Sequence, residues 1–135
     1  MMFWLELLLR PTFAIAAVIY IMLAIHVSRS SPQHANSVIG FFLLLIGTLV
    51  AGAAFSYGTQ SANIYGIGRV LAFFASGFLP VAFYVVYREY TDGPPSAILV
   101  AMLSVVPIAT TLLAVTNSMH EMIWTAVETE NGLVF

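Results

Sequence analysis

The sequence predicts an all-α integral membrane protein: a polytopic helical bundle with four transmembrane helices. Of its 135 residues, 61% are hydrophobic and only 7% are charged, whereas soluble domains carry about 25% charged residues. Polar groups cannot cover the surface of so apolar a chain, so we expect lipid to be its main solvent. In lipid the backbone must bond within the protein, and the sequence lacks the alternating ten-residue segments of a membrane barrel. Helices are the remaining choice.

The first expected span covers residues 5–27, with Arg10 at its entry end. Pro11 can sit near a helix start or cause a kink there. No basic segment precedes its first apolar run, so we expect a retained helix rather than a cleaved signal peptide. A polar run that contains Pro32 follows, and proline favours a turn there.

Three further spans are long and apolar enough to cross a bilayer, at residues 38–57, 65–87 and 96–115. The Gly-Pro-Pro sequence at 93–95 separates the last two, because it cannot continue a helix. Residues 116–135 are more polar and form an extracytoplasmic tail in this reading. The whole chain is then one membrane-embedded domain.

The arginines give a weak indication of orientation. With four spans, Arg29 and Arg88 share one side of the membrane, while Arg10 and Arg69 lie toward the other. Arg69 falls inside a helix and can snorkel to the interface, and Arg10 has an acid one turn before it. If Arg10 and Arg69 are not counted, the positive-inside rule puts Arg29 and Arg88 inside and both termini outside.

Small residues indicate where the helices pack. Without a hydrophobic force between helices in lipid, association depends on close approach at small side chains. Their spacing predicts that the second and third spans pack together through a short loop, either as simple mutual packing or as the wall of a binding crevice. The residues concerned are Gly47, Ala51, Gly52, Ser56, Gly68 and Gly77.

Arg69 is the first candidate for function, because ionisable residues inside membrane segments are costly and often functional. Its plain alternative is snorkelling. A second candidate group, Asn117, His120 and Trp124, follows the fourth span. A sensing mouth and an ordinary interfacial aromatic belt both fit that group.

The sequence points to no catalytic residue, metal ion or other cofactor. It has no cysteine, and span counting puts His26 and His120 near opposite membrane faces, so they cannot ligate one metal ion together. His26 alone is left open as an axial ligand of a haem or pigment, or as an interfacial histidine. There is no lysine and the four arginines are scattered, so nucleic acid is not an expected partner.

Several short elements occur in an order that resembles a known family. They are Leu79-Pro80, the Tyr-Arg-Glu-Tyr-Thr run at 87–91, Val106-Pro107 and Thr-Asn-x-x-His at 116–120, with Trp124 beyond. The chain resembles the N-terminal seven-helix membrane sensor region of bacterial histidine kinases, over roughly residues 38–124. Where that family has a Trp and an acid near the second span, this chain has Tyr57, which we keep as a sensing candidate.

The resemblance implies a signal-sensing region in the bacterial inner membrane, with its termini outside and its output domain beyond this chain. Three helices of the family pattern would follow residue 135. The alternative function is a small four-helix accessory subunit of a respiratory or photosynthetic complex. In either case we expect lipid and other membrane helices as partners, from the same protein or from partner subunits, and a homodimer stays open.

Overall fold

The computed structural model is built from long helices and confirms the predicted fold class. It describes residues 2–30, 34–57, 61–117, 127–129 and 132–134, with side chains for 8–30, 35–57, 61 and 63–117. Each described helix contains a segment long and apolar enough to cross a membrane. The helices are α1 (Met2–Ser30), α2 (His34–Ser56), α3 (Ala62–Thr91) and α4 (Ala97–Val115).

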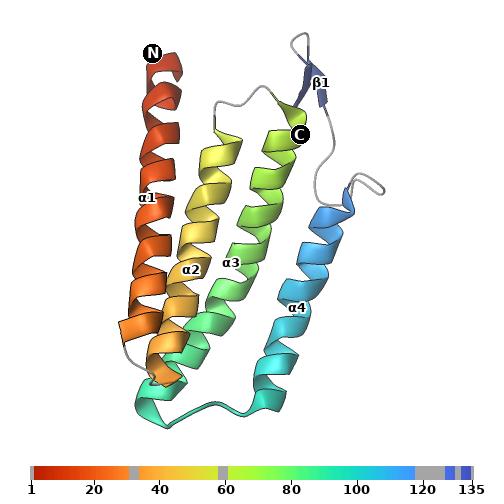
Figure 1. Ribbon diagram of the computed structural model, residues 1–135. Helices are drawn as coiled ribbons and strands as arrows, with labels where there is room; N and C mark the ends of the chain where they lie inside the picture. The colour runs from red at the N-terminus through yellow and green to blue at the C-terminus, as the bar shows by residue number, and fades with distance from the viewer. Residues whose placement is uncertain (1, 31–33, 58–60, 118–126, 130–131, 135) are drawn as a thin grey trace.

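The helices stand side by side in one row and alternate in direction (Figure 1). Within the described part of the chain, each helix contacts only the helices next to it in sequence. The row is therefore open, and α2 and α3 are the two inner helices. Both of its faces remain available to lipid or to other helices.

Small side chains fill the contacts between neighbouring helices. Leu45 is the largest fully buried side chain among the described residues, and the rest of the buried apolar set is mostly alanine. Small residues let two helix backbones approach closely, which is how membrane helices gain packing contacts. The buried alanines are Ala17, Ala24, Ala54, Ala75, Ala82 and Ala114.

The helices α1 to α3 extend further than the apolar spans that the sequence predicts. The expected range 65–87, for example, becomes a helix that runs from Ala62 to Thr91. Polar groups support the added turn: the hydroxyl of Thr91 donates to the carbonyl of Tyr87 at 3.0 Å, and Arg88 pairs with Asp92. Hydropathy marks only the membrane-crossing part of a helix, whereas the backbone bonds continue into the polar ends.

Three prolines lie inside helices that continue past them, Pro11, Pro80 and Pro107. The sequence left Pro11 either near a helix start or at a kink, and the structure places it inside α1, which already begins at Met2. Membrane helices tolerate proline because nearby hydroxyls and local adjustments bond the freed backbone groups.

A tight turn joins α3 to α4. Gly93 has a φ of 83°, in the left-handed region that favours glycine. Ser96 then caps α4, since its side chain accepts a hydrogen bond from the backbone N–H of Leu99 at 3.3 Å. The turn and the cap together allow α4 to run back beside α3.

Beyond α4 the chain forms a short antiparallel hairpin of β1 (Val127–Thr129) and β2 (Gly132–Val134), with Val127 opposite Val134. The hairpin lies near the start of α3, which β2 contacts (Figure 1). The sequence predicts only a polar tail here, because three-residue strands are too short to show an alternation of apolar and polar residues.

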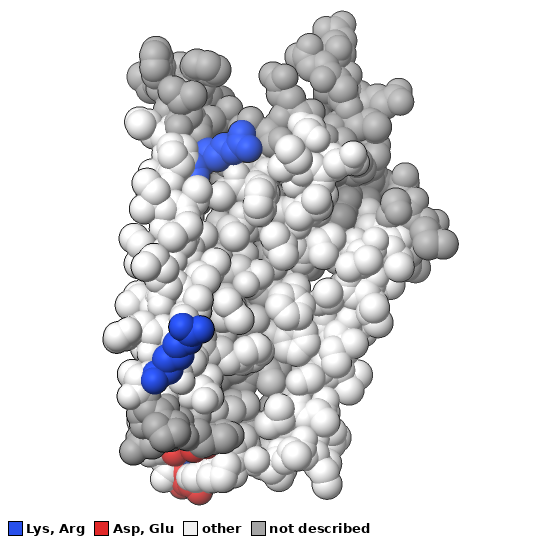
Figure 2. All heavy atoms as spheres, viewed as in Figure 1, with Lys and Arg blue, Asp and Glu red and all other residues white. Residues whose placement is uncertain are grey.

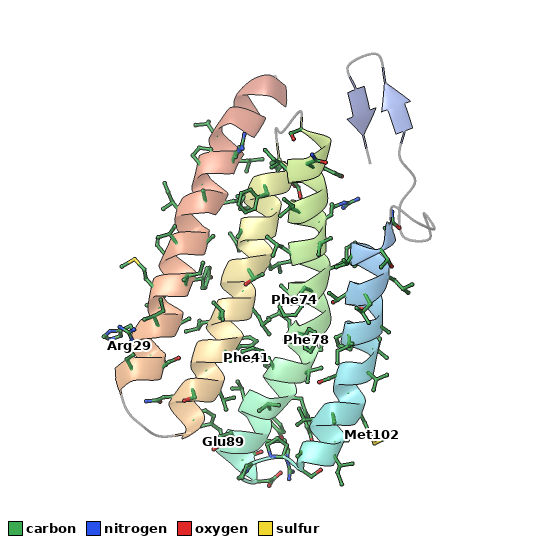
Figure 3. All side chains as sticks on the ribbon, turned by 45° about the vertical axis from the view of Figure 1, so that its right-hand side comes forward. Arg29, Phe41, Phe74, Phe78, Glu89 and Met102 are labelled. Atoms are coloured by element: carbon green, nitrogen blue, oxygen red, sulfur yellow. The ribbon has the colours of Figure 1, made fainter. Side chains whose placement is uncertain are left out.

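The described charged side chains lie toward the ends of the helices. Among the described side chains on the face shown in Figure 2, basic ones appear toward the two ends and acidic ones at the lower end. Figure 3 shows the same from another side: Arg29 and Glu89 lie at the lower end of the row, and Met102 points away from α4. This distribution suits a chain that crosses a bilayer.

Candidate functional site

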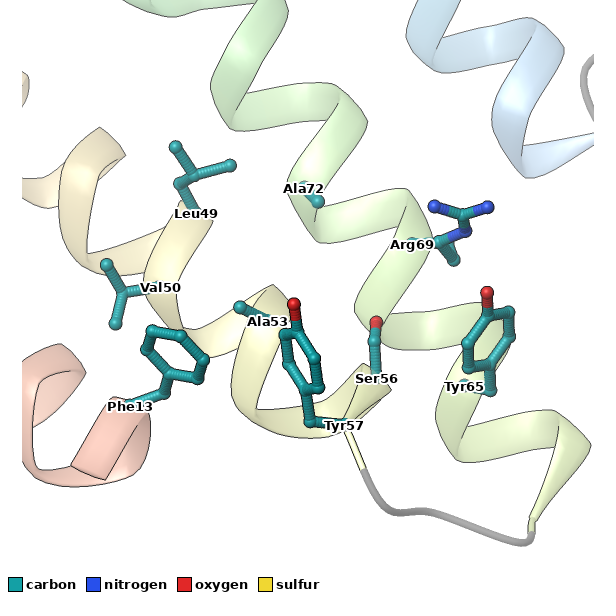
Figure 4. Close-up of a pocket in the computed structure, with 9 residues that line it drawn as sticks. All are labelled: Phe13, Leu49, Val50, Ala53, Ser56, Tyr57, Tyr65, Arg69 and Ala72. Atoms are coloured by element: carbon teal, nitrogen blue, oxygen red, sulfur yellow. The ribbon is translucent and has the colours of Figure 1, made fainter. Parts of the chain in front are cut away.

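A groove runs along one face of the row near the loop between α2 and α3 (Figure 4). Its volume is ≈ 530 Å³, within the range of roughly 300–1,000 Å³ of small-molecule sites. We call it the Arg69 groove. It is lined by Phe13, Leu49, Val50, Ala53, Ser56, Tyr57, Tyr65, Arg69 and Ala72.

Three helices build this groove. The middle helix α2 supplies its floor, Phe13 of α1 stands on one side, and Tyr65, Arg69 and Ala72 of α3 stand on the other. A molecule in the groove would therefore touch all three helices at once.

Arg69 supplies the positive charge of the groove. Its side chain is half-buried, and its Nε atom is buried without a hydrogen-bond partner. Tyr65 lies one turn earlier on the same helix, and the guanidinium carbon is 5.4 Å from the centre of its ring. This is a cation–π distance, and it holds the arginine beside the groove without neutralising it.

Aromatic rings line the opposite side. The rings of Phe13 and Tyr57 are 5.4 Å apart between centres and tilted by 31°, so they link α1 to the end of α2. Ser56 does not extend the polar surface far, because its hydroxyl donates to the carbonyl of Gly52 at 2.9 Å. One charge and a largely apolar wall therefore define the chemistry of the groove.

The polarity of the groove changes along its length. Ser56, Tyr57 and Tyr65 lie close to the loop between α2 and α3, where the polar atoms gather. Leu49 and Val50 lie two turns further from that loop and have no polar side-chain atoms. The groove is therefore more polar toward the loop and apolar further along the helices.

Two of the sensing candidates from the sequence, Arg69 and Tyr57, both line this groove. Asn117 lies elsewhere, at the end of α4, and is buried with 3% of its surface exposed. The candidates His120 and Trp124 lie outside the described residues.

The expected packing residues serve different contacts. Gly52 and Gly68 meet between α2 and α3, where a Cβ on Gly68 would also lie 2.9 Å from the backbone nitrogen of Ser56. Gly47 instead faces α1, since its Cβ would lie 3.2 Å from the Cβ of Tyr20.

The two other packing candidates contribute differently. Gly77 faces α4, because its Cβ would lie 3.4 Å from Pro107. Ala51 is half-buried within α2.

Sequence reasoning missed Phe13 and Tyr65. Tyr65 had a usable signal, because residues four apart on a helix are neighbours and Tyr65 precedes Arg69 by four. Phe13 had none, since only the packing of α1 on α2 brings it to the groove.

Among the described side chains, the other arginines and acids do not form a comparable site. A hollow of ≈ 370 Å³ between α1 and α2 contains Arg29, but that side chain is exposed. In the part of the chain that the structure describes, no three His, Asp or Glu residues gather as metal ligands would.

The chain is similar to a known protein family. The model of the family described as the N-terminal 7TM region of histidine kinase matches residues 12–135. No curated protein and no solved structure matches the chain.

Proposed function

We propose that this chain, which belongs to the family of N-terminal 7TM regions of histidine kinases, is a signal-sensing input region. The family region is the membrane part of the kinase and not its catalytic domain. The chain's own contribution is then recognition of a stimulus within the membrane, and phosphoryl transfer belongs to an output domain.

The observation that carries this proposal is the position of Arg69. A charged side chain in a membrane helix is costly, and here its Nε atom is buried without a hydrogen-bond partner in a groove that three helices share. A stimulus that binds there better in one helix arrangement than in another shifts the balance between the two. A small displacement of α1 or α3 against α2 is a change that a downstream domain can read.

The proposed location is the bacterial cytoplasmic membrane, with the loop between α2 and α3 outside. This rests on Arg29 in the last turn of α1 and Arg88 in the last turn of α3, which lie toward the same side. Arg69 lies in the groove rather than in a loop, so it carries little weight in the positive-inside count. The groove then opens in the outer leaflet.

The test uses membrane vesicles that contain the native gene product. Acid-labile phosphate on histidine is measured after addition of labelled ATP, for the wild type and for Arg69→Gln. We expect the substitution to change the phosphorylation level severalfold, because it removes the charge on which the stimulus acts.

Arg10→Gln serves as the control, since Arg10 is exposed near the same end of the molecule but does not line the groove. It should leave phosphorylation unchanged. Absence of histidine phosphate, together with co-purification of other membrane proteins at fixed stoichiometry, would instead support an accessory subunit.

A further inference from the structure

We propose that the Arg69 groove binds one anionic amphiphile, with its phosphate or carboxylate group on Arg69 and its acyl chain along α2. This names the ligand class of the site described above, and its signalling role rests on the proposed function. Three features carry the inference: the charge of Arg69, its depth in the membrane, and the change in polarity along the groove.

The first feature is a positive charge with no acid nearby among the described side chains. Among the described side chains, the carboxylates Glu89 and Asp92 lie near the other end of α3. At 1.5 Å per residue, Glu89 is about 30 Å from Arg69 along the helix, far beyond ion-pair distance. A guanidinium group presents a fork of N–H donors that fits two oxygens of a phosphate or carboxylate. An external anion is thus the natural partner.

The second feature is depth. Arg69 is about 10 Å along α3 from its first residue, Ala62. The helix has 30 residues and is about 45 Å long, whereas the hydrocarbon core is about 30 Å thick. Arg69 therefore lies near the boundary between hydrocarbon and headgroups, which is the depth of a lipid phosphate or a fatty-acid carboxylate.

The third feature is the direction of the groove. From Arg69 it continues toward the membrane centre over Ala72, Leu49 and Val50, which offer only apolar atoms. An acyl chain attached to an anionic head would lie along this floor in the same direction as the surrounding lipids. A small soluble anion would leave the apolar part empty, and a neutral lipid tail would leave Arg69 without its partner.

The test is native mass spectrometry of the purified full-length chain in detergent. Phosphatidylglycerol, phosphatidylcholine and oleate are added separately, with matched acyl chains, and inorganic phosphate is added as a head without a tail. We expect one bound phosphatidylglycerol or oleate per chain, about tenfold tighter than phosphatidylcholine. The proposal is supported whichever of phosphatidylglycerol and oleate binds more tightly. The tighter one shows whether the anionic group is a lipid phosphate or a fatty-acid carboxylate.

Variants locate the binding site. Arg69→Gln should weaken the anionic amphiphile about tenfold, to the level of phosphatidylcholine, and Arg69→Lys should bind with intermediate strength because the charge remains without the fork. Ala53→Leu should weaken binding by filling the floor of the groove. Arg10→Gln should bind like the wild type. Helical content by circular dichroism shows whether each variant is folded.

Equal binding of phosphatidylglycerol and phosphatidylcholine would overturn the proposal, as would unchanged binding by a folded Arg69→Gln. Displacement of the amphiphile by an equal concentration of inorganic phosphate would also overturn it, because the apolar floor would then contribute nothing. Loss of binding with unchanged histidine phosphorylation keeps the ligand site and refutes its role in sensing. If Arg69→Gln changes phosphorylation but the chain shows no preference for anionic amphiphiles, the role in sensing is kept and the ligand site is refuted.

Discussion

Gly52 and Gly68 bring the backbones of α2 and α3 into direct contact. A Cβ on Gly52 would lie 2.6 Å from the carbonyl oxygen of Gly68, and a Cβ on Gly68 would lie 2.6 Å from the carbonyl oxygen of Gly52. The relationship is reciprocal, so neither residue has room for a side chain. Because Arg69 is the next residue after Gly68, this contact also fixes the position of the charge at the groove.

Gly68→Ala should therefore destabilise the protein. The added methyl would meet backbone atoms, which cannot move aside as a flexible side chain can, and overpacking of this kind costs about 1–3 kcal/mol. Unfolding in mixed micelles, followed by loss of helical signal with increasing dodecyl sulfate, measures the free energy of unfolding.

Gly66→Ala is the matched control for this substitution. It lies on the same helix, and nothing is within 4 Å of its added Cβ. Replacing a helical glycine with alanine at an open position should be neutral or stabilising by up to about 1 kcal/mol. Equal stability of the two variants would contradict the close contact of α2 and α3.

The sequence was sufficient for the helices because their signals are local. Apolar length identified the membrane segments, and the Gly-Pro-Pro sequence after Asp92 marked the end of α3. The open row was not predictable in the same way. Which face of α2 meets α1 and which meets α3 depends on contacts between segments, such as Gly47 against Tyr20.

The groove was predictable only in part. Arg69 stood out because a charge in an apolar helix is rare, and Tyr57 entered through the family resemblance. Neither signal indicated that the two residues line one hollow. That both line one groove depends on the close approach of α3 to α2 at Gly68, which composition does not encode.

Gly93→Ala should destabilise the turn between α3 and α4. The φ of Gly93 is 83°, a backbone conformation that costs an alanine roughly 1–2 kcal/mol. Nothing lies within 4 Å of its added Cβ, so the whole cost is conformational. Gly93→Asn should lose less, because asparagine adopts this region more readily. The same micelle unfolding assay measures both, and equal losses would argue against a left-handed residue here.

Phe13 and Tyr57 should show a coupling energy of about 0.5–1.5 kcal/mol in a double-mutant cycle, as tilted aromatic pairs at this distance do. The cycle consists of Phe13→Leu, Tyr57→Leu and the double variant, and it compares their free energies of unfolding. Phe74 and Phe78 provide a reference pair within one helix, with ring centres 5.0 Å apart. A coupling energy near zero for Phe13 and Tyr57 would mean that α1 does not hold the end of α2 through this contact.

The membrane orientation can be tested with single cysteines, because these 135 residues contain none. Ser61 and Tyr90 are both exposed and lie at opposite ends of α3, so the proposed orientation places them on opposite sides of the membrane. A membrane-impermeant maleimide should label Ser61→Cys in intact spheroplasts and Tyr90→Cys only after permeabilisation. The reverse pattern would place the loop between α2 and α3 in the cytoplasm. The Arg69 groove would then open in the inner leaflet and draw its anionic ligand from that side.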